Sequence, residues 1–154
     1  MIRLAVFIAT FGYIGYFPFA PGTVGSLAGL AAYAMIRWIG APSVELAVIV
    51  ALFVVGAWAG TVAERYFGGI DPGPVVIDEV MGMLLTLALI PVNWSGAGAG
   101  FVLFRILDVM KPFPAGRLEH LAGGIGVMSD DAMAAAYGNI ALRLLIAFIP
   151  GLAG

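Results

Sequence analysis

Long apolar stretches recur along the chain and alternate with short turns rich in glycine, proline and polar residues. A helix needs roughly 17 to 25 mostly apolar residues to cross a bilayer. The apolar stretches predict about five helical spans, at residues 24–39, 44–63, 78–90, 97–110 and 129–148. Some of these spans are so short that they require a locally thinned bilayer. The pattern therefore predicts an all-α fold, that of a small polytopic helical membrane protein.

Turn residues set the boundaries of these spans. The sequence GAPS at 40–43 separates the first two spans, and Pro150 with Gly151 ends the last one. Residues 80–104 carry no charge, but Pro91 and the run SGAGAG interrupt them. Such breakers predict two helices joined by a turn instead of one long helix.

Charged residues gather at one end of this up-and-down arrangement. If the chain changes sides at each span, segments 10–23, 64–79 and 108–130 share one end, and only the turns near residues 40 and 93 lie at the other. The crowded end receives Glu64, Asp71, Asp78, Glu79, Asp108, Glu119, Asp130 and Asp131, together with Arg3, Arg65, Arg105, Lys111 and Arg117. By the positive-inside rule this end faces the cytoplasm. We therefore expect the polar loops of an active site at one membrane face.

Composition supports the membrane assignment and excludes several classes of function. Hydrophobic residues make up 62% of the chain and charged residues 10%, against about 25% charged residues in soluble proteins. The 154 residues suit one domain, 1–154, and no cleavable signal peptide is expected at the N-terminus. The absence of cysteine excludes thiol chemistry, and a net charge of −2 gives no basic surface for nucleic acid.

Two acidic pairs, Asp78-Glu79 and Asp130-Asp131, each open a predicted helix. A carboxylate at a helix start can cap free N–H groups and interacts favourably with the helix dipole. Two adjacent carboxylates repel each other, however, unless a cation offsets their charge. Brought together, the pairs would supply four hard oxygen ligands of the kind that Mg²⁺ binds beside water and phosphate. Helix capping and metal binding are both open at this point.

The segment 104–131 adds basic residues to this picture. Arg105 and Asp108 are three residues apart and would form a helical ion pair worth a few tenths of a kcal/mol. Lys111 ends this helix, where it would cap carbonyl groups or extend to the lipid headgroups. Beside an acidic metal site, it would instead bind a phosphate oxygen.

Several loop residues have both a structural and a chemical interpretation. Thr23 is suited to cap the helix that follows it, and a helix start of this kind also binds anions. Asp71 lies in an Asp-Pro-Gly turn and ranks below the paired acids. The glycines of residues 123–126 suit a turn better than a phosphate loop, and His120, the only histidine, is an unpromising general base.

Four blocks occur in order over most of the chain: PFAPGT and GSL within 18–27, DPGPVVIDEVMGM at 71–83, FRILDVMKPFP at 104–114, and GGIGVMSDD at 123–131. Together they closely resemble the phosphatidylglycerophosphatase A family. The resemblance implies a largely helical phosphatase that depends on Mg²⁺ and is located at the cytoplasmic face of the bacterial inner membrane. Its reaction would remove the terminal phosphate of phosphatidylglycerophosphate and leave phosphatidylglycerol.

The resemblance also implies roles for individual residues. The family's acidic blocks fall on the expected metal ligands Asp78, Glu79, Asp130 and Asp131. The expected phosphate-binding residues are Thr23, Arg105 and Lys111, the expected catalytic residues are Asp131, Glu79 and Lys111, and Asp71 and Asp108 are possible supporting residues. Asp131 or Glu79 would serve as the base. Direct attack by water and a transient aspartyl-phosphate are both open.

Two other functions are compatible with acids in a membrane protein. A CDP-alcohol phosphatidyltransferase also combines acids, Mg²⁺ and a lipid phosphate, but the chain contains no DxxDGxxAR pattern. A non-enzymatic ion or proton carrier would place its acids near the middle of the membrane. The acids here lie at loops and predicted helix starts, which favours the phosphatase.

Overall fold

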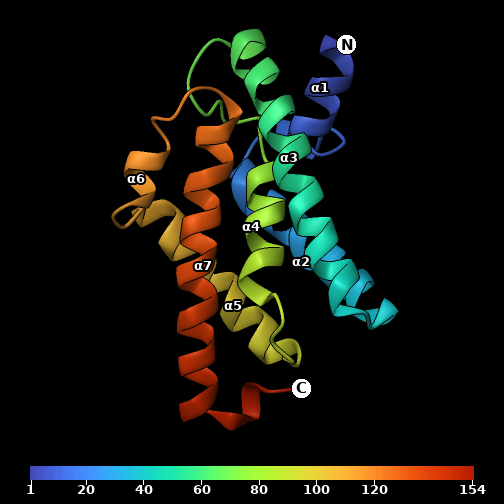
Figure 1. The fold of residues 1–154 in the computed structure, drawn as a ribbon, viewed down its shortest axis with the longest axis vertical. Helices are drawn as coiled ribbons and strands as arrows, with labels where there is room; N and C mark the ends of the chain where they lie inside the picture. Colours follow the sequence, from blue (N-terminus) through green and yellow to red (C-terminus); the bar gives the residue numbers. More distant parts are fainter.

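A computed structural model describes residues 1–154, and helices make up nearly all of the regular structure (Figure 1). The helices are α1 (Ile2–Ala9), α2 (Pro21–Ile39), α3 (Pro42–Phe67), α4 (Ile77–Leu87), α5 (Trp94–Met110), α6 (Ala115–Leu118) and α7 (Gly124–Phe148). Two short 3₁₀ turns, η1 (Ile14–Tyr16) and η2 (Pro150–Leu152), follow α1 and α7. The predicted all-α fold class is confirmed.

Helix α4 is the centre of the bundle. It passes between α3 and α7 in Figure 1, and it also contacts α2 and α5. Nine of its 11 residues are buried, and Met81, Met83, Leu84 and Leu87 belong to the hydrophobic core. A helix of this length is about 16 Å long, which is half of the roughly 30 Å hydrocarbon core of a bilayer. The predicted span at 78–90 is therefore an interior helix that does not cross the membrane by itself.

Close helix packing around α4 depends on glycine. A Cβ atom on Gly29 of α2 would lie 2.7 Å from the carbonyl oxygen of Val80, and one on Gly82 would collide with the ring of Phe104. Both distances are too short for a side chain. These two glycines bring α2 and α5 close to the first half of α4, where the paired acids Asp78 and Glu79 lie.

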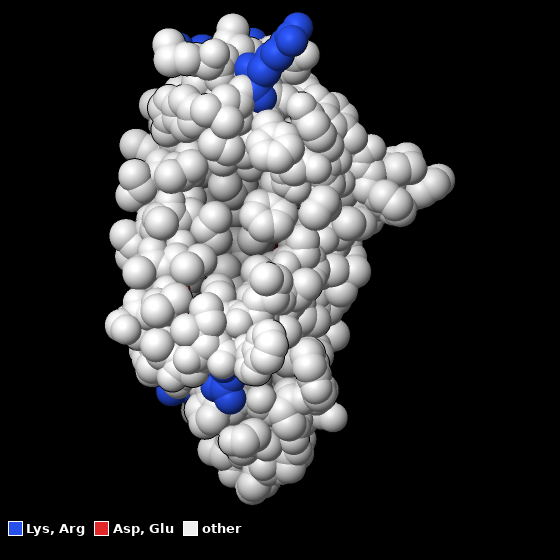
Figure 2. Space-filling model, turned by 90° about the vertical axis from the view of Figure 1, so that its right-hand side faces the viewer, with Lys and Arg blue, Asp and Glu red and all other residues white.

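Helices α3 and α7 have the length and apolarity needed to cross a membrane. Their most apolar windows have mean hydropathies of 2.4 and 1.3. Large side chains are exposed along one stripe of α3, at Leu46, Val50, Val54 and Trp58. Figure 2 shows Lys and Arg atoms at the top and in the lower part of one face, and hardly any Asp or Glu atoms on the surface between them. Such an apolar band is suited to contact with lipid tails.

Two helix boundaries differ from the predictions at functionally important places. Helix α7 begins at Gly124 and not at residue 129, so Asp130 and Asp131 lie in its second turn. Helix capping therefore does not explain this acidic pair. The cause is close packing on α3: the N–H of Gly124 donates to Thr61 Oγ1 over 2.9 Å, and a Cβ on Gly124 would collide with the Ala57 carbonyl oxygen.

The start of α2 also differs from the prediction. The helix begins at Pro21, and Ala20 occupies the N-cap position without a side-chain hydrogen bond. Thr23 therefore lies within the first turn and does not cap the helix. Pro21 suits this position because proline has the backbone angle φ of a helix and no N–H to leave unpaired. Helix α1, which the span criterion missed, is only eight residues long.

Candidate metal centre

Three carboxylates, two buried and one partly buried, meet where the first turn of α4 faces the second turn of α7. Asp78 and Glu79 come from α4, and Asp131 comes from α7. One oxygen from each carboxylate lies within 4.8 Å of the others. Asp78 and Asp131 are only 4% and 3% exposed. We call these three residues the inner acidic group.

The inner acidic group contains unpaired acceptors. Asp78 Oδ1, Glu79 Oε2 and Asp131 Oδ2 are buried and have no hydrogen-bond partner. A buried acceptor without a partner costs roughly 1–3 kcal/mol, and more when it is charged. Crowded carboxylates also repel one another. A divalent cation that prefers oxygen ligands could bind one oxygen of each carboxylate and offset their charge, so the residues fit such an ion.

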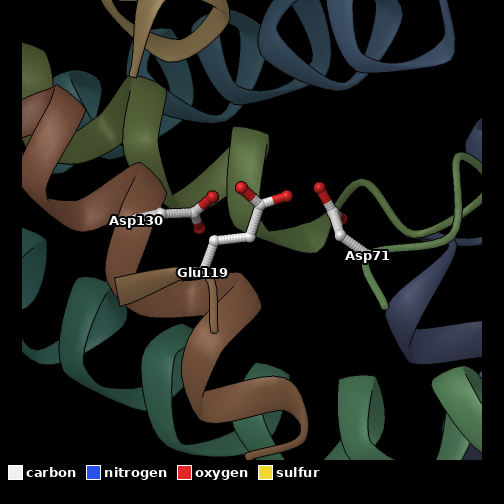
Figure 3. Close-up of side chains that lie close together, drawn as sticks. All are labelled: Asp71, Glu119 and Asp130. Atoms are coloured by element: carbon white, nitrogen blue, oxygen red, sulfur yellow. The ribbon is translucent and has the colours of Figure 1, made fainter. Parts of the chain in front are cut away.

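A second acidic group lies beside the first and already contains a cation. Asp71, Glu119 and Asp130 also bring one oxygen each within 4.8 Å of the others, and Figure 3 shows their carboxylates in a row with Glu119 in the middle. Lys111 Nζ lies 2.6 Å from Asp130 Oδ2, 3.1 Å from Glu119 Oε1 and 3.7 Å from Asp71 Oδ2. We call these three acids the outer acidic group.

The four predicted metal ligands are therefore divided between the two groups. Asp78, Glu79 and Asp131 form the inner group, whereas Asp130 turns to Lys111. Neighbouring side chains on a helix point about 100° apart, so an adjacent pair reaches two different places. Asp130 still contacts its neighbour, because its Oδ1 accepts the N–H of Asp131 over 2.9 Å.

Lys111 is positioned by the end of α5 and by α7. It occupies the C-cap of α5 in a left-handed conformation with φ of 42°, and its N–H donates to the Leu107 carbonyl oxygen. Tyr137 of α7 donates its hydroxyl to the Phe113 carbonyl oxygen over 3.0 Å, which fixes the segment after Lys111. The Lys111 ammonium is thus held close to α7.

The charges around Lys111 keep it protonated. Burial by itself lowers the pKa of Lys111, but the hydrogen bond and the charge of Asp130, with Glu119 and Asp71, raise this pKa above its usual value. Burial raises the pKa of Asp71, whereas the charge of Lys111 lowers it. The ammonium therefore carries its positive charge throughout the physiological pH range.

Arg105 borders the inner acidic group on its other side. Its Nη1 lies 2.6 Å from Asp108 Oδ2, and this contact is the predicted ion pair. The same nitrogen lies 3.9 Å from Glu79 Oε1. The same nitrogen donates to Ser26 Oγ over 3.3 Å. A Cβ on Gly22 of α2 would collide with Glu79 Oε1, so a larger residue there would displace the Glu79 carboxylate.

Sequence reasoning did not identify Gly22 or Glu119 as site residues. Glu119 holds Lys111, and its sequence signal is its place as an acid eight positions after this lysine. The signal for Gly22 is its place in the PGT block at a helix start. Of the other candidates, Thr23 lies next to Gly22, and His120 is exposed and makes no side-chain hydrogen bond.

A family model and two similar proteins point to the same protein family. The family model described as phosphatidylglycerophosphatase A matches residues 7–146. A protein of Bacteroides thetaiotaomicron named putative phosphatidylinositol-3-phosphatase is 36% identical over 149 residues, which cover 92% of each chain. Proteins named phosphatidylglycerophosphatase A from Escherichia coli and Haemophilus influenzae are 36% and 37% identical, over 78% and 79% of this chain and 70% and 76% of their own lengths. No solved structure matches.

Proposed function

The chain belongs to the phosphatidylglycerophosphatase A family, and from this premise we propose that it hydrolyses phosphatidylglycerophosphate to phosphatidylglycerol and inorganic phosphate with the help of Mg²⁺. The chain is an enzyme, a lipid phosphatase, as its sequence blocks predicted. The observation that carries the metal-dependent mechanism is the inner acidic group, with its three unpaired buried oxygens, Arg105 at its edge, and Lys111 in the outer acidic group.

Asp78, Glu79 and Asp131 would hold the cation. A divalent ion bound there would neutralise negative charge on the phosphate and make bound water more acidic. Lys111 and Arg105 donate hydrogen bonds to the phosphoryl oxygens, because phosphoryl transfer depends mainly on positioning and on stabilisation of spread charge. Glu79 or Asp131 accepts the proton of the attacking water. Thr23, one residue from Gly22 at the start of α2, donates its hydroxyl to the phosphate.

The arrangement of the helices suits a lipid substrate. The chain is a bacterial membrane protein, and we propose that it spans the inner membrane several times with its site on the cytoplasmic side. The acyl chains of the substrate stay in the bilayer, while the headgroup phosphate reaches the acids at the starts of α4 and α7. No water-filled tunnel through the bundle is then needed.

Phosphate release from defined lipids tests this proposal. The purified protein in mixed micelles should release phosphate from phosphatidylglycerophosphate with Mg²⁺ and lose this activity in EDTA. Full activity in EDTA would refute the metal assignment. Phosphatidylinositol 3-phosphate is the necessary comparison substrate, because the name of one relative refers to that lipid. Faster release from it would reassign the substrate.

The same experiment separates the other two functions. A phosphatidyltransferase would consume a CDP-linked lipid and form a phosphodiester without free phosphate. A carrier would move ions across liposome membranes and release no phosphate from any lipid. Asp131→Asn should abolish phosphate release, and normal turnover in this variant would refute the role of Asp131.

A further inference from the structure

The two acidic groups differ in what balances their charge. Both contain three carboxylates, and both use a residue from the second turn of α7, Asp131 in the inner group and Asp130 in the outer group. The outer group surrounds the Lys111 ammonium. The inner group has three buried oxygens without a partner. Its only nearby cation, Arg105, is 3.9 Å from Glu79 and is bound more closely by Asp108 at 2.6 Å.

We propose that Lys111 supplies the second cation of this centre, so that the chain binds a single divalent metal ion in the inner acidic group. The inference rests on the proposed phosphatase function, which requires positive charge beside a phosphate. In phosphatases with two metal ions, the ions lie about 3.5–4 Å apart and share the work of stabilising the attacking and leaving oxygens. Here the outer acidic group, which has three carboxylates like the inner one, holds an ammonium group.

The contacts of Lys111 support this assignment. An ion entering the outer acidic group would have to displace an ammonium that Asp130 holds at 2.6 Å and Glu119 at 3.1 Å. Removing that ammonium would leave three carboxylates within 4.8 Å of one another, as in the inner group. The lysine thus keeps a site of the same composition closed to metal.

The longest contact of Lys111 leaves it free to bind substrate. Asp71 Oδ2 is 3.7 Å from Nζ, beyond the usual hydrogen-bond distance. An ammonium group has three N–H donors, so the donor facing Asp71 can turn to a phosphoryl oxygen while Asp130 and Glu119 keep the other two. Lysine binds phosphate as a point charge, which is the role that a second metal ion would have.

Counting bound Mn²⁺ tests the inference without substrate. The full-length protein in detergent is titrated with Mn²⁺, and free and bound ions are measured by electron paramagnetic resonance. The wild type should bind one Mn²⁺ per chain, with the spectrum of an isolated ion. Lys111→Met, which keeps an unbranched side chain one atom shorter and removes its charge, should bind two ions per chain and show the broadened spectrum of a coupled pair. Lys111→Arg should again bind one.

Three outcomes would overturn the inference. The first is that the wild-type chain binds two Mn²⁺ ions. The second is that Lys111→Met binds one Mn²⁺ with unchanged affinity. The third is that the number of bound Mn²⁺ ions does not depend on the charge at position 111. If Lys111→Met fails to fold, the number of Mn²⁺ ions bound by the wild type still tests the inference, together with two other variants. Glu79→Gln should weaken Mn²⁺ binding at least 10-fold, whereas Glu119→Gln should change it less than 3-fold. Weakening in Glu119→Gln that equals or exceeds the weakening in Glu79→Gln would refute the assignment of the ion to the inner group.

Failure of the enzymatic proposal gives a different pattern. A chain that binds one Mn²⁺, gains a second in Lys111→Met and releases no phosphate from any lipid would refute the phosphatase mechanism and uphold the cation count. Phosphate release by a wild-type chain that binds two ions would uphold the phosphatase function and refute the proposed cation count.

Discussion

Buried carboxylates occur at two distant places in the molecule, and only one of these places has the properties of a metal site. Asp78 and Asp131 belong to a group with three unpaired oxygens. Glu45 is also buried, at 7% exposure, but it lies alone in the first turn of α3. Its Oε2 accepts the N–H of Leu89 over 3.4 Å, its Oε1 is a single unpaired oxygen, and a helix start favours its charge. Burial of an acid is thus a weak signal, whereas the convergence of several unpaired acceptors is a strong one.

The largest expected effect is on catalysis. Asp78→Asn should lower the rate of phosphate release roughly 10³-fold, because it removes one ligand of the ion that balances charge in the reaction. Glu45→Gln, which changes an equally buried acid outside the site, should change the rate less than about 2-fold. Initial rates with phosphatidylglycerophosphate measure both. A similar loss in the two variants would mean that buried acids serve the fold alone.

The second effect is on stability in the presence of metal. Mg²⁺ at about 100 times its Kd should stabilise the folded protein by about 2.7 kcal/mol, and thermal melting with Mg²⁺ or EDTA measures the change in Tm. We expect this rise in Tm for the wild type and for Glu45→Gln. Asp131→Asn should show almost none of it. A full rise in that variant would exclude Asp131 as a ligand.

A third prediction compares two glycines. Gly22→Ala should lower kcat/KM by about 10- to 100-fold, because the added Cβ displaces the Glu79 carboxylate. Gly98→Ala is the matched control, since Gly98 lies in α5 with no atom near the position of its Cβ. This control should keep full activity and gain up to about 1 kcal/mol of stability from the better helix former. Equal activities in the two variants would show that Glu79 tolerates displacement.

The helices could be predicted where the sequence has long apolar stretches. A turn separates α2 from α3 as expected, although it comprises only residues 40 and 41 of the predicted 40–43. The predicted membership of the phosphatidylglycerophosphatase A family is confirmed. Helix α4 was placed correctly but misread as a span, because a helix buried in protein has the same apolar composition as one that faces lipid. The start of α7 was missed because glycines that normally indicate a turn here allow close packing on α3.

The site could be predicted only in part, for a geometric reason. Sequence proximity groups Asp130 with Asp131, but their directions on α7 send them to different acidic groups. Gly22 acts through a contact with Glu79, which is far away in the chain, and Glu119 reaches Lys111 because the chain turns back between them. Such contacts depend on how the helices pack, and no local pattern contains that information.

The smallest expected effect on activity comes from the place where α5 begins beside the C-terminal segment. Asn93 caps α5 there: its Oδ1 accepts the N–H of Gly96 over 3.0 Å, and its Nδ2 donates to the carbonyl oxygens of Gly151 and Ala153. Every polar atom of this side chain has a partner, in contrast to the inner acidic group. Asn93→Ala should therefore cost about 1 kcal/mol of unfolding free energy and leave the rate of phosphate release unchanged.

A denaturant titration of the detergent-solubilised protein measures this cost, and Asn93→Ser is the control that separates its two parts. Serine can still cap the helix through its hydroxyl, but it has no amide to donate to the C-terminal segment. If Asn93→Ser is as stable as the wild type, the cap alone accounts for the role of Asn93. A fall in activity in either variant would link this segment to the acids of α4 and α7. It would then be wrong to separate a polar side chain whose hydrogen bonds are all made, which stabilises the fold, from carboxylates with unpaired oxygens, which bind a metal ion.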